Sequence, residues 1–476
     1  MRMILSSRDE KLLSLIELIE REKFQTFNQI EKALEINPRT LNSLIKYGNE
    51  IFSPGEIYRS KEGIILIHSS ETITVKYYYQ KILENSLEFN IIESVFFDQY
   101  TISKLVNKLF ISESTLRRLI DKLNVELTKI EMKIDTKIVA LNGNEKNICN
   151  LIIHLLLEKY SDCTFLFDGY RVSFVESIIK KVFKQRNIGL NYPDFYRVKV
   201  WLLVVFHRAN QTRRQTHGVR LRDSILVKLL SIEALKRTLY FPLKNNPYIN
   251  ALDFLFSEQM IFEYEELEKK IKYDPLLKEK KERFDRIIHY IEEYFNIVIT
   301  DHREKLLVDL CNAASIHFGP PFILYDKYKM FSEEVMKYNK TFFIEIKKVF
   351  MSQFPNEPAY VIDTYLYMII THWPQLLLSL NKTISPIRLS LVFDSDIEHM
   401  EMIENLIGIL FPRRFMIKIV SHFTSLKELK NIIDTQLVVT NICDLNLPRK
   451  DIIVTSLYPS ENELEKLRDY YENDAD

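Results

Sequence analysis

Glycine and cysteine are both scarce in this chain. There are 9 glycines and 4 cysteines in 476 residues. So few glycines argue against Gly-rich phosphate loops and against β-sandwiches with many tight turns. The cysteines form no CxxC pair, so we expect reduced thiols, no disulfide framework and no zinc site. No pair of histidines has the HExxH spacing or a similar one, and we therefore expect no metal and no cofactor. The four cysteines are Cys149, Cys163, Cys311 and Cys443.

Long apolar runs are also missing. No stretch of about 18 uninterrupted apolar residues occurs, so we expect no membrane-spanning helix. The first ten residues lack the apolar core of a signal peptide, and we expect a cytoplasmic protein. Hydrophobic residues make up 46% of the chain and charged residues 27%, as in folded soluble proteins. A length of 476 residues predicts about three to five domains.

The charge is balanced overall but not by region. Lys and Arg number 21 against 21 Asp and Glu in residues 1–150, 17 against 7 in residues 151–250, and 27 against 37 in residues 251–476. The basic middle can meet nucleic acid, phosphate or the acidic part of another subunit, or it is simply a solvated surface. Because residues 1–150 are neutral, any DNA binding by them is expected to depend on dimerisation.

The first seventy residues follow the order helix, turn, helix, hairpin. Residues 26–34 have the apolar spacing of a short helix. Asn37 and Pro38 then supply an N-cap and a first helical position for a second helix. Residues 56–67 read as a β-hairpin.

The same order recurs in the next segment. Residues 98–109 predict a first helix, and Ser112 is the expected N-cap of a second helix that runs through Leu123. Residues 132–143 predict another hairpin. Helix, turn, helix and hairpin is the order of a winged helix-turn-helix module, so the sequence predicts two of them.

In such a module the second helix enters the major groove of DNA, and its N-terminal residues reach the base edges. Arginine pairs with guanine in two places at once, and lysine neutralises phosphate. The predicted DNA-reading residues are Ser114, Thr115, Arg117, Arg118 and Lys122 in the second module and Arg39, Thr40, Asn42 and Lys46 in the first. The predicted wing contacts to phosphate are Arg59, Lys61, Lys133 and Lys137.

These features resemble the Mga family of virulence transcription regulators from Gram-positive bacteria. Residues 101–109, the segment 112–118 and the Leu-Asn-Gly-Asn-Glu sequence at 141–145 are similar to that family's main DNA-binding motif. The resemblance implies a mainly α, multidomain chain of five parts. They are winged helix-turn-helix modules at 1–69 and 70–160, phosphotransferase regulation domains at 161–275 and 276–382, and an enzyme-IIB-like α/β domain at 383–476.

Regulation domains of this kind are helical bundles whose histidines accept a phosphoryl group, so the resemblance implies regulatory histidines here. His207 follows an apolar helix, and Arg214 stands seven residues later, on the same helical face, where it can hold a phosphoryl group. In the second bundle His372 resembles the later histidine of the family pattern. The earlier histidine is absent from its expected place, and His317 and His289 are displaced candidates. The alternative for each is a hydrogen-bonded core histidine.

The last ninety residues alternate short β-branched runs with amphipathic helices, which predicts a parallel sheet. Strands are expected at 387–393, 416–420, 437–440 and 452–455. Enzyme IIB carries a phosphate-accepting cysteine just after its first strand, but this chain has Asp394-Ser395-Asp396 there. We therefore expect a non-catalytic domain for dimerisation or sensing.

The leading hypothesis is a non-enzymatic, homodimeric transcription regulator, an activator, that binds double-stranded DNA. Its activity would be tuned by histidine phosphorylation from the phosphocarrier protein of the sugar phosphotransferase system. An RNA-binding antiterminator shares such regulation domains but needs a small β-rich N-terminal module. A phosphocarrier enzyme lacks its cysteine here. A protein-interaction scaffold stays open.

Overall fold

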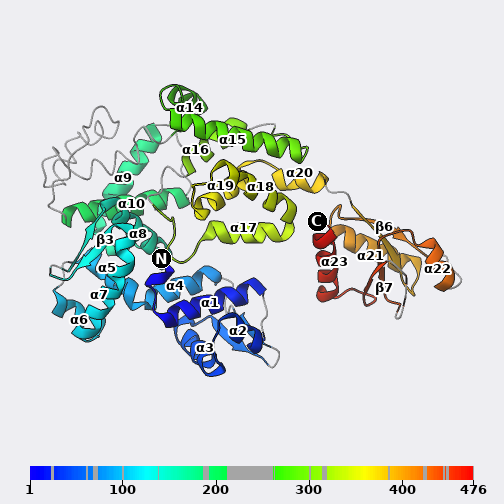
Figure 1. Cartoon of the computed structure of the whole chain (residues 1–476), viewed down its shortest axis with the longest axis horizontal. Helices are drawn as coiled ribbons and strands as arrows, with labels where there is room; N and C mark the ends of the chain where they lie inside the picture. Colours follow the sequence, from blue (N-terminus) through cyan, green and yellow to red (C-terminus); the bar gives the residue numbers. More distant parts are fainter. Residues whose placement is uncertain are drawn as a thin grey trace. The chain divides into compact units, whose positions relative to one another are not determined.

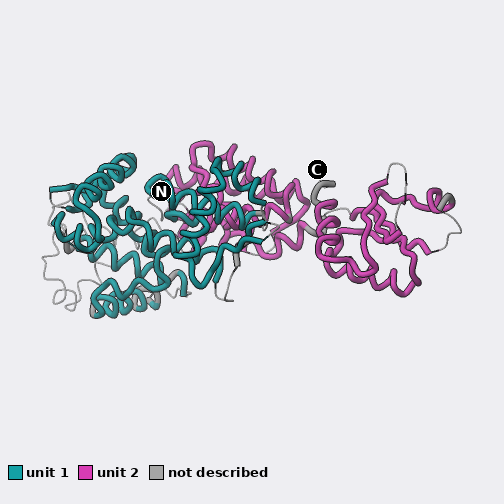
Figure 2. Tube along the Cα trace, turned by 90° about the horizontal axis from the view of Figure 1, so that it is seen from below, with its two compact units in different colours: residues 1–260, 315–326 teal, residues 261–314, 327–476 magenta. Residues whose placement is uncertain are grey.

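The computed structural model of the chain forms two compact units. Figure 2 colours unit 1, residues 1–260 and 315–326, apart from unit 2, residues 261–314 and 327–476. The structure describes residues 1–22, 26–60, 63–67, 73–98, 101–137, 139–185, 192–211, 261, 263–299, 302–313, 319–383, 386–421, 426–442, 445, 447 and 450–474.

Unit 1 is a helical body with two small antiparallel hairpins (Figure 1). Its helices are α1 (Ser7–Glu22), α2 (Phe27–Ala33), α3 (Pro38–Phe52), α4 (Val75–Asn85), α5 (Leu87–Phe97), α6 (Ile102–Leu109), α7 (Glu113–Leu127), α8 (Glu145–Lys159), α9 (Gly169–Gln185) and α10 (Tyr192–Gln211). Its hairpins pair β1 (Glu56–Arg59) with β2 (Ile64–Ile67) and β3 (Met132–Asp135) with β4 (Ala140–Gly143). Short 3-10 turns are η1 (Arg2–Ile4), η2 (Thr128–Ile130) and η3 (Thr164–Leu166).

The two predicted helix, turn, helix, hairpin segments are built alike at intervals of 75 residues. Thr26 and Thr101 cap the first helix of each, and Asn37 and Ser112 cap the second, each by accepting a backbone N–H three residues on. In the turn after the first helix of each module, one residue has a left-handed backbone conformation. It is Glu35 in the first module, with φ of 51°, and Phe110 in the second, with φ of 54°. The expected caps are therefore confirmed, and the repeat is structural although the sequences differ.

An asparagine fastens the hairpin to the second helix in both modules. Asn49 bonds the backbone N–H and carbonyl of Ile57 at 2.7 and 3.1 Å, and Asn124, 75 residues later, bonds those of Ile134 at 2.7 and 3.0 Å. A side-chain amide satisfies both groups of one strand residue in each case. Each hairpin is thereby fixed relative to its helix.

Helices α4 and α5, between the modules, were not predicted. Helix α5 buries seven of its eleven residues, so the simple spacing of an exposed amphipathic helix is weak there. Helix α4 does have one apolar face, with Tyr78, Tyr79, Ile82 and Leu83 buried on it, and its pattern was overlooked. The predicted helix at 98–109 begins later than expected, because Asp98 follows the end of α5 and Thr101 is the N-cap of α6.

Unit 2 contains a helical part and a small α/β part. The helices of the first part are α14 (Tyr264–Lys270), α15 (Pro275–Tyr294), α16 (Arg303–Ala313), α17 (Lys327–Tyr338), α18 (Lys340–Gln353), α19 (Ala359–His372) and α20 (Leu376–Thr383). Phe284, Phe350 and Tyr365 are fully buried at its centre, with ring centroids of Phe284 and Tyr365 4.9 Å apart. Aromatic packing of this kind adds to the burial of apolar area.

The α/β part confirms the predicted parallel sheet. Its strand order is β6-β5-β7-β8, and all three neighbouring pairs are parallel. The elements are β5 (Ile387–Val392), α21 (Ile397–Leu410), β6 (Phe415–Ile419), α22 (Leu426–Ile432), β7 (Leu437–Thr440), β8 (Asp451–Val454) and α23 (Glu461–Asp474). Ser395 follows β5 and lies 2.8 Å from His399 Nδ1, while Cys443 is outside the described residues.

The structure confirms a mainly helical chain with a small parallel sheet. The division into five domains at the predicted boundaries stays a prediction. Among the described helices, none is long and apolar enough to cross a membrane. Within the same residues, no group of three or more His, Cys, Asp or Glu side chains is placed to hold a metal ion.

Candidate nucleic-acid interface

The second helix-turn-helix places one face of α7 in the core and the opposite face in solvent. Leu116, Ile120, Leu123 and Leu127 are fully buried. Ser114, Arg117 and Arg118 lie on the exposed face, and Thr115 is half-buried. Four apolar residues at helical spacing thus anchor α7 and leave its polar N-terminal turns accessible.

The hydroxyl groups at the start of α7 form a local network. Ser112 Oγ accepts the Thr115 backbone N–H at 3.1 Å and lies 2.9 Å from Ser114 Oγ and 2.8 Å from Thr115 Oγ1. The hydroxyls are therefore ordered at the end of the helix that is expected to approach the base edges.

The two arginines of α7 differ in their surroundings. Arg117 donates from Nε and Nη2 to Glu113 Oε1, at 2.9 and 2.7 Å, across one helical turn. Arg118 is exposed, and no side-chain partner is recorded for it in the described part of the chain. Arg118 is consequently the more available of the two cations, because Arg117 has to leave Glu113 to contact a ligand.

Lys122 has a different environment from the other predicted DNA contacts. Its Nζ donates to the Leu5 carbonyl at 2.7 Å and lies 3.5 Å from a carboxylate oxygen of buried Glu88. Tyr47 stands at the equivalent position of the first module, 75 residues earlier, and its hydroxyl donates to Asp9 at 2.9 Å. Both side chains bond within unit 1, so packing explains this position without DNA.

The wing of the second module carries two exposed lysines. Lys133 lies on β3, and Lys137 lies in the turn that follows, where its backbone N–H donates to Asp135 at 2.8 Å. Because Asn124 ties β3 to α7, these lysines keep a fixed place relative to the exposed face of α7.

In the first module the predicted contact residues are partly joined to one another. The Arg59 guanidinium donates to Asn42 Oδ1 at 2.8 Å and lies 4.0 Å from the centroid of the Phe27 ring. This pair connects α3 to β1, as cation–π stacking and a hydrogen bond together hold the arginine. Arg39 and Lys46 are exposed on α3. Thr40 donates its backbone N–H to the Asn37 cap, and Lys61 lies outside the described residues.

His207, on α10, contacts the segment that enters the second helix-turn-helix. Its Nε2 lies 3.2 Å from the carbonyl oxygen of Phe97, the last residue of α5. The imidazole packs against Phe96 and Phe97, with ring centroids 5.3 and 5.0 Å away. Burial lowers the pKa of His207 below its ordinary value. Because a carbonyl oxygen only accepts, Nε2 is the donor in the bond to Phe97.

The next residue, Arg208, was not predicted and contacts the other end of the same module. It is 5% exposed. Its guanidinium donates to Glu145 at 2.8 and 3.0 Å and to the carbonyl of Leu141, on β4, at 2.6 Å. Two consecutive residues of α10 thus bond to the two ends of residues 97–145. The sequence signal was an arginine directly after an apolar helix, which by itself is common.

The other predicted histidines are in unit 2 or outside the description. His372 Nδ1 lies 2.7 Å from Asp309 Oδ2, which joins α19 to α16. His289 is exposed and lies 3.2 Å from Glu293 of its own helix. His317 and Arg214 lie outside the described residues.

Comparison with known families gives a match that covers this site. Residues 71–156 match the family described as the Mga helix-turn-helix domain, a range that includes α4 to α7, both wing strands and most of α8. The match supports membership of the Mga-like family. A comparison with curated proteins found none that matches.

Proposed function

Because residues 71–156 carry an Mga helix-turn-helix domain, we propose that this chain is a DNA-binding transcription regulator. The observation that supports it most directly is the exposed N-terminal face of α7, which carries Arg118, together with the exposed Lys133 and Lys137 of the wing. Helix and wing would contact the major groove and the flanking phosphates, respectively. The equivalent face of α3 would make a second contact.

Two alternatives receive less support. An antiterminator of the kind considered above would need a β-rich RNA-binding module. The described part of residues 1–143 has instead helices and two hairpins of two strands each. A scaffold that binds only proteins would not require an exposed arginine at the start of α7. The proposal includes no enzymatic activity, in keeping with a family of transcription regulators.

Control by phosphorylation of His207 is the finer part of the proposal. A phosphoryl group on Nε2 would replace the hydrogen bond to Phe97 and bring negative charge among aromatic rings. The end of α5, which leads into α6, would have to repack. A phosphocarrier protein is the proposed donor, and His372, bonded to Asp309, is the second proposed acceptor. No contact of the described chain supports such a role for exposed His289.

A homodimer is proposed as the binding form, because two-fold symmetric proteins read paired half-sites with tight spacing. Sedimentation velocity with and without duplex DNA tests it. A single monomeric species bound to DNA at saturation would contradict a dimeric binding form.

The first experiment measures fluorescence anisotropy of a labelled duplex from upstream of the chain's own gene, at two salt concentrations. One variant is the double substitution Arg117→Ala/Arg118→Ala. The control is Lys129→Ala, which removes an exposed cation that follows the end of α7 and is paired with Glu126. We expect the double variant to lose at least about tenfold in affinity, since each arginine contact to a base contributes ~1–3 kcal/mol. The control should bind like the parent.

An RNA hairpin is titrated in parallel. Tighter binding to the hairpin than to the duplex, or equal loss of duplex binding in the double variant and in Lys129→Ala, would contradict the proposal.

A further inference from the structure

One short segment of the chain belongs to unit 1 although the helices on both sides of it belong to unit 2. Residues 319–326, which we call the strap, lie between α16 and α17 in the sequence. The chain therefore leaves unit 2 after Ala314, contributes the strap to unit 1, and returns to unit 2 at Lys327. The strap is directly continuous in sequence with α17, which begins at Lys327.

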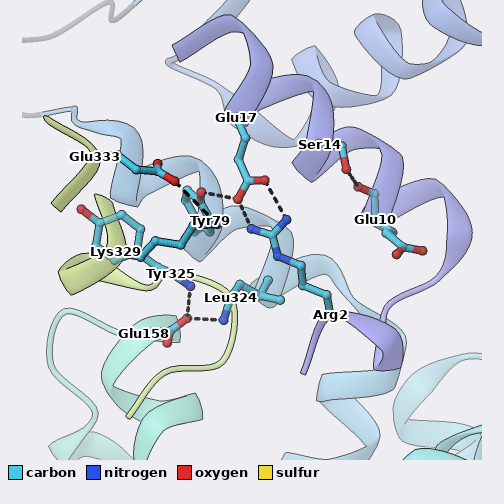
Figure 3. Close-up of polar contacts among 10 residues, drawn as sticks. All are labelled: Arg2, Glu10, Ser14, Glu17, Tyr79, Glu158, Leu324, Tyr325, Lys329 and Glu333. Atoms are coloured by element: carbon cyan, nitrogen blue, oxygen red, sulfur yellow. Dashed lines mark hydrogen bonds and ion pairs between the residues drawn. The ribbon is translucent and has the colours of Figure 1, made fainter. Parts of the chain in front are cut away.

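A single buried carboxylate holds the strap in unit 1. Glu158 of α8 accepts three successive backbone N–H groups, those of Ile323, Leu324 and Tyr325, at 2.5, 2.9 and 3.1 Å. Figure 3 shows the carboxylate facing the backbone nitrogens of Leu324 and Tyr325. Nearby Asn150, also on α8, donates to the Pro320 carbonyl at 3.2 Å. Three donors on two oxygens fix both the position and the direction of the strap.

Side chains of the strap continue into the core of unit 1. Ile323 and Leu324 are each 2% exposed and belong to its hydrophobic core. The Tyr325 ring packs edge-on against Tyr79 of α4, with centroids 5.0 Å apart. The strap therefore contacts α4 as well as α8.

From Tyr79 the contacts reach the N-terminal helix. The Tyr79 hydroxyl donates to Glu17 of α1 at 2.6 Å, and Glu17 also accepts the Arg2 guanidinium at 2.7 Å (Figure 3). The strap is consequently hydrogen-bonded to α8, which follows the second wing. It also contacts Tyr79, which is hydrogen-bonded to α1, and α1 packs against α3 of the first module. Both helix-turn-helix modules are within reach of it.

In unit 2, the helices that flank the strap are joined to α19, which carries His372. The His372–Asp309 bond connects α19 to α16. On the other side, Tyr328 and Phe331 of α17 pack against Tyr367 of α19, with ring centroids 4.8 and 5.0 Å apart. A change at His372 therefore acts on the two helices that continue into the strap.

We propose that the strap couples the state of His372 to the DNA-binding modules, with Glu158 as the positioning residue that makes the coupling tight. The inference rests on the proposed function for its DNA readout. A charge or phosphoryl group at His372 changes its bond to Asp309, α16 and α17 shift together, and the strap carries the shift to α8 and α4. Coupling of this kind needs a contiguous set of bonds, and it is reciprocal.

The test uses the full chain and a set of single and double variants. His372→Ala removes the bond to Asp309, Glu158→Gln removes at least one acceptor for the strap amides, and the double variant combines them. Glu93→Gln is the matched control, because Glu93 is also a largely buried carboxylate that bonds α8, through Lys159 and Tyr160, but has no bond to the strap. Tyr325→Leu, which removes the ring contact with Tyr79, is a second uncoupling variant.

The first readout is hydrogen exchange of the Ile323, Leu324 and Tyr325 amides, without DNA. We expect His372→Ala to speed their exchange at least fivefold and Glu93→Gln to leave it within twofold of the parent. The second readout is the Kd for duplex DNA. His372→Ala should change it at least threefold in the parent and less than 1.5-fold when Glu158→Gln or Tyr325→Leu is present.

Unchanged hydrogen exchange of the strap amides in His372→Ala would overturn the coupling. A change of the Kd in the double variant equal to the product of the changes in His372→Ala and Glu158→Gln would overturn it too. If the parent chain binds no duplex at all, the proposed function fails, while the exchange readout still decides whether His372 and the strap are coupled.

Discussion

Arg208 should control the placement of the second wing without touching DNA. It bonds Glu145 at the start of α8 and the Leu141 carbonyl on β4, and it is buried. Substitution by Ala removes three charge-assisted hydrogen bonds. Such bonds contribute about 1.5–3 kcal/mol each when buried.

The net cost is smaller than the sum of these bonds. The Glu145 side chain is 40% exposed, so water replaces much of its bond to Arg208. The bond to the Leu141 carbonyl remains as the main loss, and we expect the wing to be loosened by about 2 kcal/mol. A destabilisation of that size changes an opening equilibrium by roughly 30-fold. The affinity for DNA falls by the same factor as the population of molecules with a closed wing, so a decrease of up to about 30-fold is expected.

The assay is duplex binding as a function of salt. Arg208→Ala should raise the Kd but leave the slope of log Kd against log salt unchanged, because no phosphate contact is lost. Lys133→Ala is the comparison, and it should lower that slope by about 1. Arg208→Lys should lie between the parent and Arg208→Ala, because an ammonium keeps the charge but not the fork.

Two results would refute this reasoning. A slope that falls in Arg208→Ala as it does in Lys133→Ala would mean that Arg208 contacts phosphate itself. Unchanged affinity together with unchanged hydrogen exchange of the β4 amides would mean that the wing does not depend on Arg208.

Three further predictions follow from local geometry. Glu113→Gln should tighten duplex binding about two- to fivefold, because it frees Arg117 and removes a negative charge from the face that would approach phosphate. The control Glu126→Gln removes the partner of Lys129 and should leave the Kd unchanged. Equal Kd values for the two variants would contradict this prediction. Gly143→Ala should destabilise unit 1 by more than about 1 kcal/mol in denaturant unfolding, because φ of Gly143 is 139° and an added Cβ would lie 2.2 Å from the Glu131 carbonyl oxygen. An unfolding midpoint equal to that of the parent would disprove this prediction. Burial raises the pKa of Glu158 to about 7 despite its three amide bonds and the nearby Lys76. The protonated Glu158 carboxyl therefore stabilises the fold fully below about pH 4.5, and this stabilisation is lost as the pH rises to about 7. The loss is at most about 3 kcal/mol. The unfolding free energy of the parent should fall between these pH values relative to that of Glu158→Gln.

Local sequence patterns predicted several elements of the fold. The caps at Asn37 and Ser112, the two hairpins, and the parallel order of the C-terminal strands all depend on residues near one another in the sequence, so spacing and capping chemistry were enough. The accessible face of α7 followed in the same way. Helix α5 was missed, because a helix buried on most sides lacks a polar side that reveals its period.

The sequence by itself determined two helix-turn-helix modules, their exposed basic residues and a C-terminal α/β fold. Only the tertiary structure decided which of those residues are already bonded. Arg117 faces Glu113 across one helical turn, but Lys122 reaches Leu5 over 117 positions, and Glu158 reaches the strap over 165. Partners so distant in the sequence are brought together by packing of the core, and no spacing rule records them. The same packing set His207 and Arg208 against the two ends of one module, which a run of apolar residues before them does not reveal.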